Sequence, residues 1–214
     1  MKYAWSTLLV TLGLLASGGA LFFHLTQGLA AFTSETARQI DIRVHPVSVP
    51  PIMAYDQSGN VLRINEDPSG LGRMAIVDFI YTRCTSICSA LGASYQQLQT
   101  QIVAAHLEQR VRLVTISFDP AHDDPAAMSA YAKRMHADPA VWTVLTVTHP
   151  SQLPNLLQAF GVVVVPAPLE EFQHNAAFHL VDERGNLVRI LDIAQPAAAL
   201  AEAQQLAISA RPRT

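Results

Sequence analysis

Apolar residues form three continuous runs in the middle of the chain, and these runs predict strands. They are MAIVDFIYT at 74–82, VRLVTISFD at 111–119 and WTVLTV at 142–147, and they are rich in β-branched or aromatic residues. Strands covered on both faces of a sheet show this near-continuous pattern, whereas half-buried strands alternate. The runs therefore predict the central strands of a sheet.

Between and after these runs, apolar residues recur every three or four positions, which predicts amphipathic helices. The first helix carries its apolar stripe at Leu91, Tyr95, Leu98 and Ile102. Asp124 followed by Pro125 has the form of an N-cap and a first helical residue. Ser151 is expected to cap a third helix that ends at Gly161, and Pro196 opens an alanine-rich last helix.

Two turn signals predict hairpins. The segment PIMAYDQSGNVLRI at 51–64 reads as two short strands around the turn residues 56–60. Residues 176–182 and 187–191 flank a second turn at 183–186. Strands and helices thus alternate along most of the chain, which predicts an α/β fold with a central mixed sheet and flanking helices.

The N-terminal segment has no charged side chain from residue 3 to residue 34, and residues 3–23 are mostly apolar. About 20 helical residues span a bilayer core of about 30 Å. The apolar part of a cleavable signal peptide is shorter, about 7–15 residues, although the small residues at 16–20 imitate a cleavage region. We expect residues 1–34 to be an uncleaved anchor, with a cleaved signal peptide as the alternative.

Lys2 is the one charged side chain before the span and Arg38 and Arg43 lie beyond it, so the positive-inside bias is faint. We expect a cytoplasmic N-terminus. The expected protein is a single-pass protein of the cell inner membrane. Its soluble domain, residues 50–214, would face the periplasm, an oxidising extracytoplasmic compartment. Residues 35–49, which include most of the proline-rich HPVSVPP, are expected to form a stiff extended linker.

Composition limits the class of protein further. Half of the 214 residues are hydrophobic, 14% are charged, and the formal net charge is −3. Such a chain can bury a core and does not have the composition of a disordered protein. Because no dense basic cluster occurs, a nucleic-acid partner is not expected.

The stretch YTRCTSIC at 81–88 contains both cysteines of the chain, just past the first central strand. If Cys84 and Cys88 lie on the opening turn of the following helix, their Cα atoms are roughly 6 Å apart, within the range of a disulfide. A helix N-terminus lowers the pKa of a thiol, and Arg83 could add to this effect. Three interpretations remain open: a redox pair, two metal ligands, or two small core residues.

Two thiolates prefer a soft metal, and Cu(I) accepts two or three ligands. One of the eight histidines could supply a third. His174 lies in an expected polar loop before the last hairpin, free to reach the cysteines, whereas His179 lies inside a predicted strand. From spacing alone, a surface role for His174 is favoured over a ligand role.

The chain resembles the Sco/SenC family of thioredoxin-fold copper proteins over roughly residues 50–200. DFIYTRCTSIC is similar to the family's strand and Cys-x-x-x-Cys motif. ISFDPAHDDPAAMSAYAKRM is similar to its second strand, Asp-Pro turn and helix, and HNAAFHLVDERGNLV to its histidine and hairpin. The resemblance implies a thioredoxin-like fold that binds copper, as Cu(I) or Cu(II), through Cys84, Cys88 and His174.

Other positions either match or depart from the family pattern. Asp119 matches an acidic residue near the family's site, with an ordinary turn residue as the equal alternative. His179 matches no ligand position. The family usually has proline after each cysteine and aspartate before the histidine, where this chain has Thr85, Ser89 and Gln173.

The resemblance implies a metallochaperone that delivers copper to an apo-subunit of a haem-copper oxidase during cytochrome c oxidase assembly. A thiol reductant or another copper donor would be a further partner. The alternative is an extracytoplasmic thiol–disulfide oxidoreductase acting on the cysteines of such a subunit, since one dithiol supports either function. No specific motif supports a peroxidase, and a structural zinc site would normally need four ligands.

Overall fold

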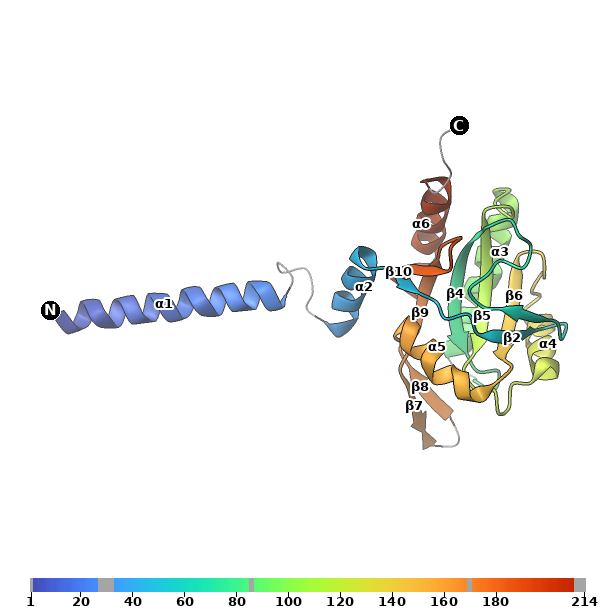
Figure 1. Cartoon of the computed structure of the whole chain (residues 1–214), viewed down its shortest axis with the longest axis horizontal. Coiled ribbons are helices and arrows are strands. Elements are labelled where there is room, and N and C mark those ends of the chain that lie inside the picture. Colours follow the sequence, from blue (N-terminus) through green and yellow to red (C-terminus); the bar gives the residue numbers. More distant parts are fainter. Residues whose placement is uncertain (1, 27–32, 85–86, 169–170, 210–214) are drawn as a thin grey trace. The chain divides into compact units, whose positions relative to one another are not determined.

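The computed structural model describes residues 2–26, 33–84, 87–168 and 171–209; it does not describe the side chains of 2–4, 6 and 87–90. The chain divides into two compact units, residues 1–44 and residues 45–214. Figure 1 shows the helices and strands of both units.

The first unit contains two helices, α1 (Lys2–Leu25) and α2 (Ser34–Val44). Within the described ranges, the segment Thr7–Leu25 of α1 is the one helix long and apolar enough to cross a membrane, judged by length and composition. This helix coincides with the expected apolar span.

Helix α2 corrects part of the sequence interpretation, because the expected linker 35–49 is not extended throughout. The hydroxyl of Thr33 accepts a hydrogen bond from the backbone N–H of Thr36 at 3.1 Å, and Glu35 pairs with Arg38 at 2.8 Å. These local contacts stabilise a helix that contains few apolar residues. The prolines that favour an extended chain begin at Pro46, after the helix has ended.

The second unit is built on a mixed sheet, as predicted. Among the described residues, its eight strands lie in the order β1 (Val47–Ser48), β10 (Asn186–Asp192), β9 (Ala177–Val181), β4 (Met74–Ile80), β5 (Val111–Ser117), β6 (Trp142–Val147), β2 (Met53–Asp56) and β3 (Val61–Arg63). The strands β4, β5 and β6 are parallel, and β9 runs antiparallel to β4. Every residue of β4 and β5 is buried, which confirms the reading of their continuous apolar runs.

Helices cover both faces of this sheet, as the α/β prediction requires. They are α3 (Ile87–Ala104), α4 (Pro125–Arg134), α5 (Leu153–Phe160), which follows the 3-10 turn η1 (Pro150–Gln152), and α6 (Pro196–Ser209). Tyr95 of α3 packs against Phe178, and Phe160 of α5 packs against His179. Neighbouring residues of a strand point to opposite faces, so α3 and α5 lie on opposite sides of the sheet (Figure 1).

Helix ends agree with the sequence signals at three of four sites, one of them Pro196, the first residue of α6. Asp124 caps α4 by accepting a hydrogen bond from the backbone N–H of Ala127 at 2.8 Å. Gly161 ends α5 with a φ of 62°, a left-handed conformation that glycine adopts without strain. Ser151 does not cap α5, because it lies inside η1 and the residue before α5 is Gln152.

A second, two-stranded sheet was not predicted. It joins β7 (Val164–Ala167) to β8 (Glu171–His174) in antiparallel register, with Val164 opposite His174. His174 is therefore the last residue of a strand rather than part of a polar loop. The sequence pattern does not predict β8, because residues 171–174 carry polar side chains at three of four positions and alternate only between exposed and half-buried.

A buried ion pair fixes the loop that leads into β4. Arg73 donates to both carboxylate oxygens of Asp67, at 2.9 and 3.0 Å, and the side chains are only 7% and 4% exposed. Burial alone would raise the pKa of Asp67, but hydrogen bonds from Arg73 and Ser69 outweigh it and hold that pKa well below its usual value.

Replacing Asp67 should destabilise the protein in a pH-dependent way. Asp67→Asn leaves a buried guanidinium without its carboxylate, and we expect a loss of about 3 kcal/mol in unfolding free energy at pH 7. Because the pKa of Asp67 is lower in the folded chain, this contribution is complete above the unfolded value of about 4 and disappears as the pH falls below it. Urea unfolding at several pH values measures the difference.

The adjacent, exposed pair of Glu66 and Arg63 provides the control, since its side chains are 58% and 56% exposed. Glu66→Gln should change the unfolding free energy by no more than about 0.5 kcal/mol. Equal effects of the two substitutions would show that the Asp67–Arg73 pair does not stabilise the fold.

Candidate metal and thiol site

Cys84 lies in the loop that follows β4, before α3 begins. It is half-buried, and its backbone N–H donates to the carbonyl oxygen of Tyr81 at 3.2 Å. Cys84 lies outside α3 as described, which spans Ile87–Ala104, and residues 85 and 86 are outside the described residues, so the helical spacing expected for the two cysteines stays a prediction. The predicted position at the carboxyl end of the first central strand is correct.

Cys88 belongs to the first turn of α3, and its side chain lies outside the described part of the structure. The same holds for the side chain of Ser89 and for Thr85 altogether. The separation of the two sulfur atoms is therefore not described, and the cysteine pairing stays a prediction.

A buried carboxylate anchors the segment before Cys84. Asp123, fully buried, accepts hydrogen bonds from the backbone N–H of Thr82 at 3.0 Å and from the Thr82 hydroxyl at 2.5 Å. It also accepts a bond from the hydroxyl of Ser117, the last residue of β5, at 2.5 Å. Asp123 thus ties the ends of two central strands together and holds the backbone two residues ahead of the cysteine.

A charged network lies on the other side of the same segment. Arg83 donates to Asp119 at 3.0 Å, and the Nδ1 atom of His122 lies 2.9 and 3.0 Å from the two oxygens of the same carboxylate. The side chain of Asp119 is 7% exposed and those of Arg83 and His122 are 37% and 51% exposed. Asp119 thereby offsets the positive charge of Arg83. It also contacts His122, so its side chain does more than form a turn.

His174 presents a donor that the rest of the described structure does not use. Its ring packs on Phe118 with the centroids 5.0 Å apart. Among the described residues, neither of its buried ring nitrogens has a hydrogen-bond partner. Burial lowers the pKa of His174, so the ring is neutral at pH 7 and keeps a lone pair that can bind a metal.

Aromatic side chains join the cysteine segment to the strand of His174. The ring of Tyr81 lies 5.4 Å from Phe118 and 5.2 Å from Phe172, two residues before the histidine. The hydroxyl of Tyr81 accepts a hydrogen bond from the backbone N–H of Phe172 at 3.4 Å. Burial raises the pKa of Tyr81, and a hydrogen bond with Cys84 raises it further. Cys84 and His174 are thus attached to one aromatic cluster.

The structure also shows the surroundings of two other residues from the sequence analysis, His179 and Gln173. His179 is fully buried between Phe79 and Phe160, and its Nδ1 atom lies 3.3 Å from the carbonyl oxygen of Val77. It is a core residue, as the sequence allowed. Gln173, where the family has aspartate, is exposed on β8.

The described side chains do not by themselves complete a metal site. The side chain of Cys88 is not one of them. Among the side chains that are described, no three His, Cys, Asp or Glu groups lie close enough together to hold an ion. Cys84 and His174 are the described members of the expected set of three. Two thiolates and one neutral imidazole suit Cu(I), so the residue types fit copper.

Sequence reasoning missed the residues that support the site. Tyr81 and Phe118 appear as ordinary members of apolar runs, Phe172 stands alone in a polar segment, and Asp123 appears as one acid among several near Asp124. The signal that could have found Asp123 is its place after a central strand, where polar side chains of α/β proteins converge.

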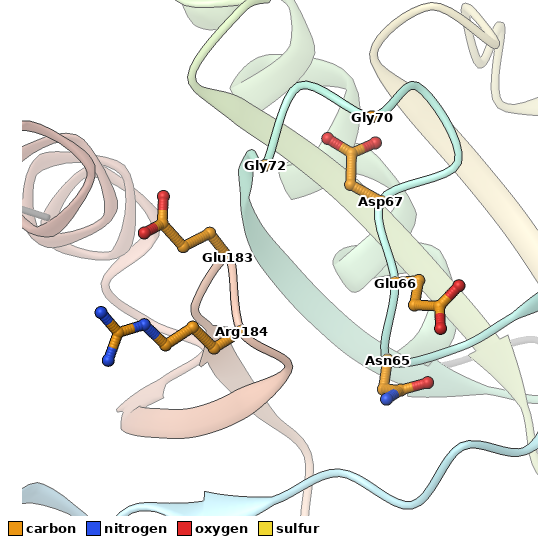
Figure 2. Close-up of a pocket in the computed structure, with 7 residues that line it drawn as sticks. All are labelled: Asn65, Glu66, Asp67, Gly70, Gly72, Glu183 and Arg184. Atoms are coloured by element: carbon orange, nitrogen blue, oxygen red, sulfur yellow. The ribbon is translucent and has the colours of Figure 1, made fainter. Parts of the chain in front are cut away.

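A separate cavity of about 410 Å³ lies at the other end of β4. Its lining comes from the loop before β4 and from the β9–β10 turn, as Figure 2 shows: Asn65, Glu66, Asp67, Gly70, Gly72, Glu183 and Arg184. Asp67 is already engaged by Arg73 there. This cavity is not part of the cysteine site.

The α/β fold and the cysteine motif after its first central strand define a thioredoxin-like protein. Residues 54–208 match the family model SCO1/SenC, and the chain belongs to this family. The resemblance seen in the sequence is thereby confirmed.

Relatives of known structure or sequence agree with this assignment. The SCO1 protein homolog of Bacillus subtilis (strain 168) is 27% identical over 143 residues, which cover 66% of this chain and 72% of that protein. BsSco, a member of the Sco family of cytochrome c oxidase assembly proteins with an identified disulfide switch, has a TM-score of 0.65 at 22% identity, covering 77% of this chain and 95% of that one. Copper-bound ScoI of Bradyrhizobium japonicum has a TM-score of 0.60 at 22% identity, with coverages of 74% and 98%.

The anchoring role of Asp123 predicts a local effect on the backbone. Asp123→Asn keeps the size of the side chain but replaces one of its two accepting oxygens with an NH2 group. The NH2 group can only donate, whereas the groups around it, from Thr82 and Ser117, are themselves donors. We expect the amide of Thr82 to exchange with solvent at least about tenfold faster, the equivalent of a lost charged hydrogen bond. Hydrogen exchange followed by NMR or mass spectrometry measures this.

The neighbouring acid supplies a matched control. Asp124→Ala removes the N-cap of α4 and should cost about 1 kcal/mol of stability without changing exchange at Thr82. If Thr82 exchanges at the wild-type rate in Asp123→Asn, the carboxylate does not hold the cysteine segment.

Proposed function

We propose that this protein is a membrane-anchored copper metallochaperone that binds copper through Cys84, Cys88 and His174 and delivers it to a respiratory oxidase. The observation that carries the proposal is the half-buried, neutral imidazole of His174, whose buried nitrogens have no partner among the described residues. Burying such a group costs free energy unless something binds it. A metal ion shared with the cysteine segment is the occupant that suits the donors.

The chemistry of the donors supports a soft, exchangeable cargo. Thiolates favour Cu(I), and a third imidazole ligand gives trigonal coordination with an open side for an incoming ligand. Copper would leave by ligand exchange, as sulfur or nitrogen atoms of the recipient replace these donors one at a time. Copper bound to ScoI of Bradyrhizobium japonicum, which has the same fold, supports this proposal.

The cellular setting is also proposed. The apolar helix Thr7–Leu25 is long enough to hold the chain in a membrane. A cytoplasmic N-terminus would put the domain from residue 50 onward in the periplasm, beside the copper-binding subunit of a haem-copper oxidase. That BsSco belongs to a family of cytochrome c oxidase assembly proteins supports this recipient.

A second candidate function is thiol–disulfide exchange on the cysteines of the same recipient. It is favoured by the disulfide switch identified in BsSco. The two functions make different demands on His174, because copper needs its nitrogen whereas a dithiol does not. The potential of a dithiol is set mainly by thiol pKa and disulfide strain.

His174→Ala should separate the two functions. In the reduced full chain in detergent, its Cu(I) affinity should fall at least about a hundredfold, since loss of even an outer-shell partner costs about 10–100-fold. The dithiol potential should change little. Competition with a Cu(I) chelator and redox titration measure the two quantities.

His149→Ala removes an exposed histidine without a side-chain capping bond and should leave both quantities unchanged. Cys84→Ser should abolish tight binding. Wild-type copper affinity in His174→Ala, next to a clear loss in Cys84→Ser, would eliminate the three-ligand site.

A further inference from the structure

The pair formed by His122 and Asp119 has the geometry of a metal-binding imidazole. Within the described structure, the polar contacts of the His122 ring run through Nδ1, which lies 2.9 and 3.0 Å from the two oxygens of Asp119 and 3.2 Å from a nitrogen of Arg83. A carboxylate can only accept, and a guanidinium can only donate. The shorter contacts to Asp119 therefore place the proton on Nδ1.

This proton position leaves the lone pair of the ring on Nε2. Histidines that bind metals commonly donate their other N–H to a carboxylate, which fixes the ring and makes the free nitrogen a better donor. Asp119 is itself held, because its backbone N–H donates to the hydroxyl of Ser117 at 3.0 Å. The His122 side chain is 51% exposed, so an arriving ion can reach it.

The location of His122 links it to the cysteine segment. Arg83, the residue directly before Cys84, contacts both Asp119 and His122. The charge of Arg83 is offset by Asp119, so a copper ion that approaches the ring does not face an unbalanced cation. His174, by contrast, is half-buried behind Phe118 and less accessible to an incoming donor.

We propose that His122 is a transient copper ligand through which the ion enters and leaves the site formed by Cys84, Cys88 and His174. The inference rests on the proposed copper-binding function. On entry, a bond between Nε2 and Cu(I) forms as a donor ligand leaves. A bond from the Cys84 sulfur then replaces the Nε2 bond, and the thiol proton passes to water. No electron is transferred, and exit follows the same steps in reverse.

A transient ligand has a distinctive kinetic signature. Because it lowers the barrier between the donor-bound and the resident states, it speeds entry and exit by the same factor and leaves the affinity unchanged. A resident ligand changes the affinity instead. If His122 had a purely structural role, the copper exchange rates would depend on its hydrogen bond to Asp119 and not on its free nitrogen.

Three substitutions of His122 distinguish these roles. His122→Gln can still donate to Asp119 but is a poor Cu(I) donor, and His122→Ala offers neither contact. His122→Met lacks the hydrogen bond but supplies a thioether, which binds Cu(I). His149→Ala is the control for loss of an exposed histidine.

The experiment is stopped-flow exchange of Cu(I) between bicinchoninate and the reduced full chain in detergent, in both directions. We expect His122→Gln and His122→Ala to slow loading and extraction equally, by about tenfold, with affinity within about twofold of wild type. His122→Met should restore most of the rate, and His149→Ala should match wild type.

Wild-type rates in His122→Gln, or a His122→Met variant as slow as His122→Gln, would overturn the inference and leave the copper site intact. A fall in affinity that matches the fall in loading rate would also overturn it, because His122 would then be a resident ligand. If the wild-type chain fails to bind Cu(I) at equilibrium, the proposed function fails and the inference fails with it.

Discussion

The site depends on one buried carboxylate, that of Asp123. It is fully buried and accepts three hydrogen bonds, two from Thr82 and one from Ser117. A buried carboxylate that lacked such donors would be costly, so the end of the β5–α4 loop, which carries Asp123, must meet the ends of β4 and β5. These hydrogen bonds fix the backbone directly before Cys84, next to the aromatic cluster that contains Tyr81.

The rest of the site follows from this anchor. Tyr81 lies at the end of the fixed segment, and its ring contacts Phe118 and Phe172, which places β8 and His174 beside the cysteine loop. In the proposed site, one donor is therefore carried by the loop that follows β4 of the central sheet and another by a small hairpin outside that sheet. A ligand set divided in this way would suit the proposed exchange of a soft metal.

Much of this architecture was predictable from the sequence, for physical reasons that also explain the errors. The strand β4 is covered on both faces, so its sequence is continuously apolar and easily read. Helix α2 is stabilised by local polar contacts and contains few apolar residues, and among the described residues β8 pairs with β7 alone and carries polar side chains at three of its four positions. The contact between Thr82 and Asp123 spans 41 positions and leaves no local pattern. The cysteines were recognisable from their spacing, and the ligand role proposed for His174 came from the family resemblance alone.

X-ray absorption at the copper edge tests the central claim most directly. The sample is the reduced full chain in detergent with one equivalent of Cu(I). The proposed site predicts a first shell of two sulfur atoms and one imidazole nitrogen, from Cys84, Cys88 and His174. A spectrum without sulfur neighbours, or with two sulfurs and no imidazole nitrogen, would contradict it.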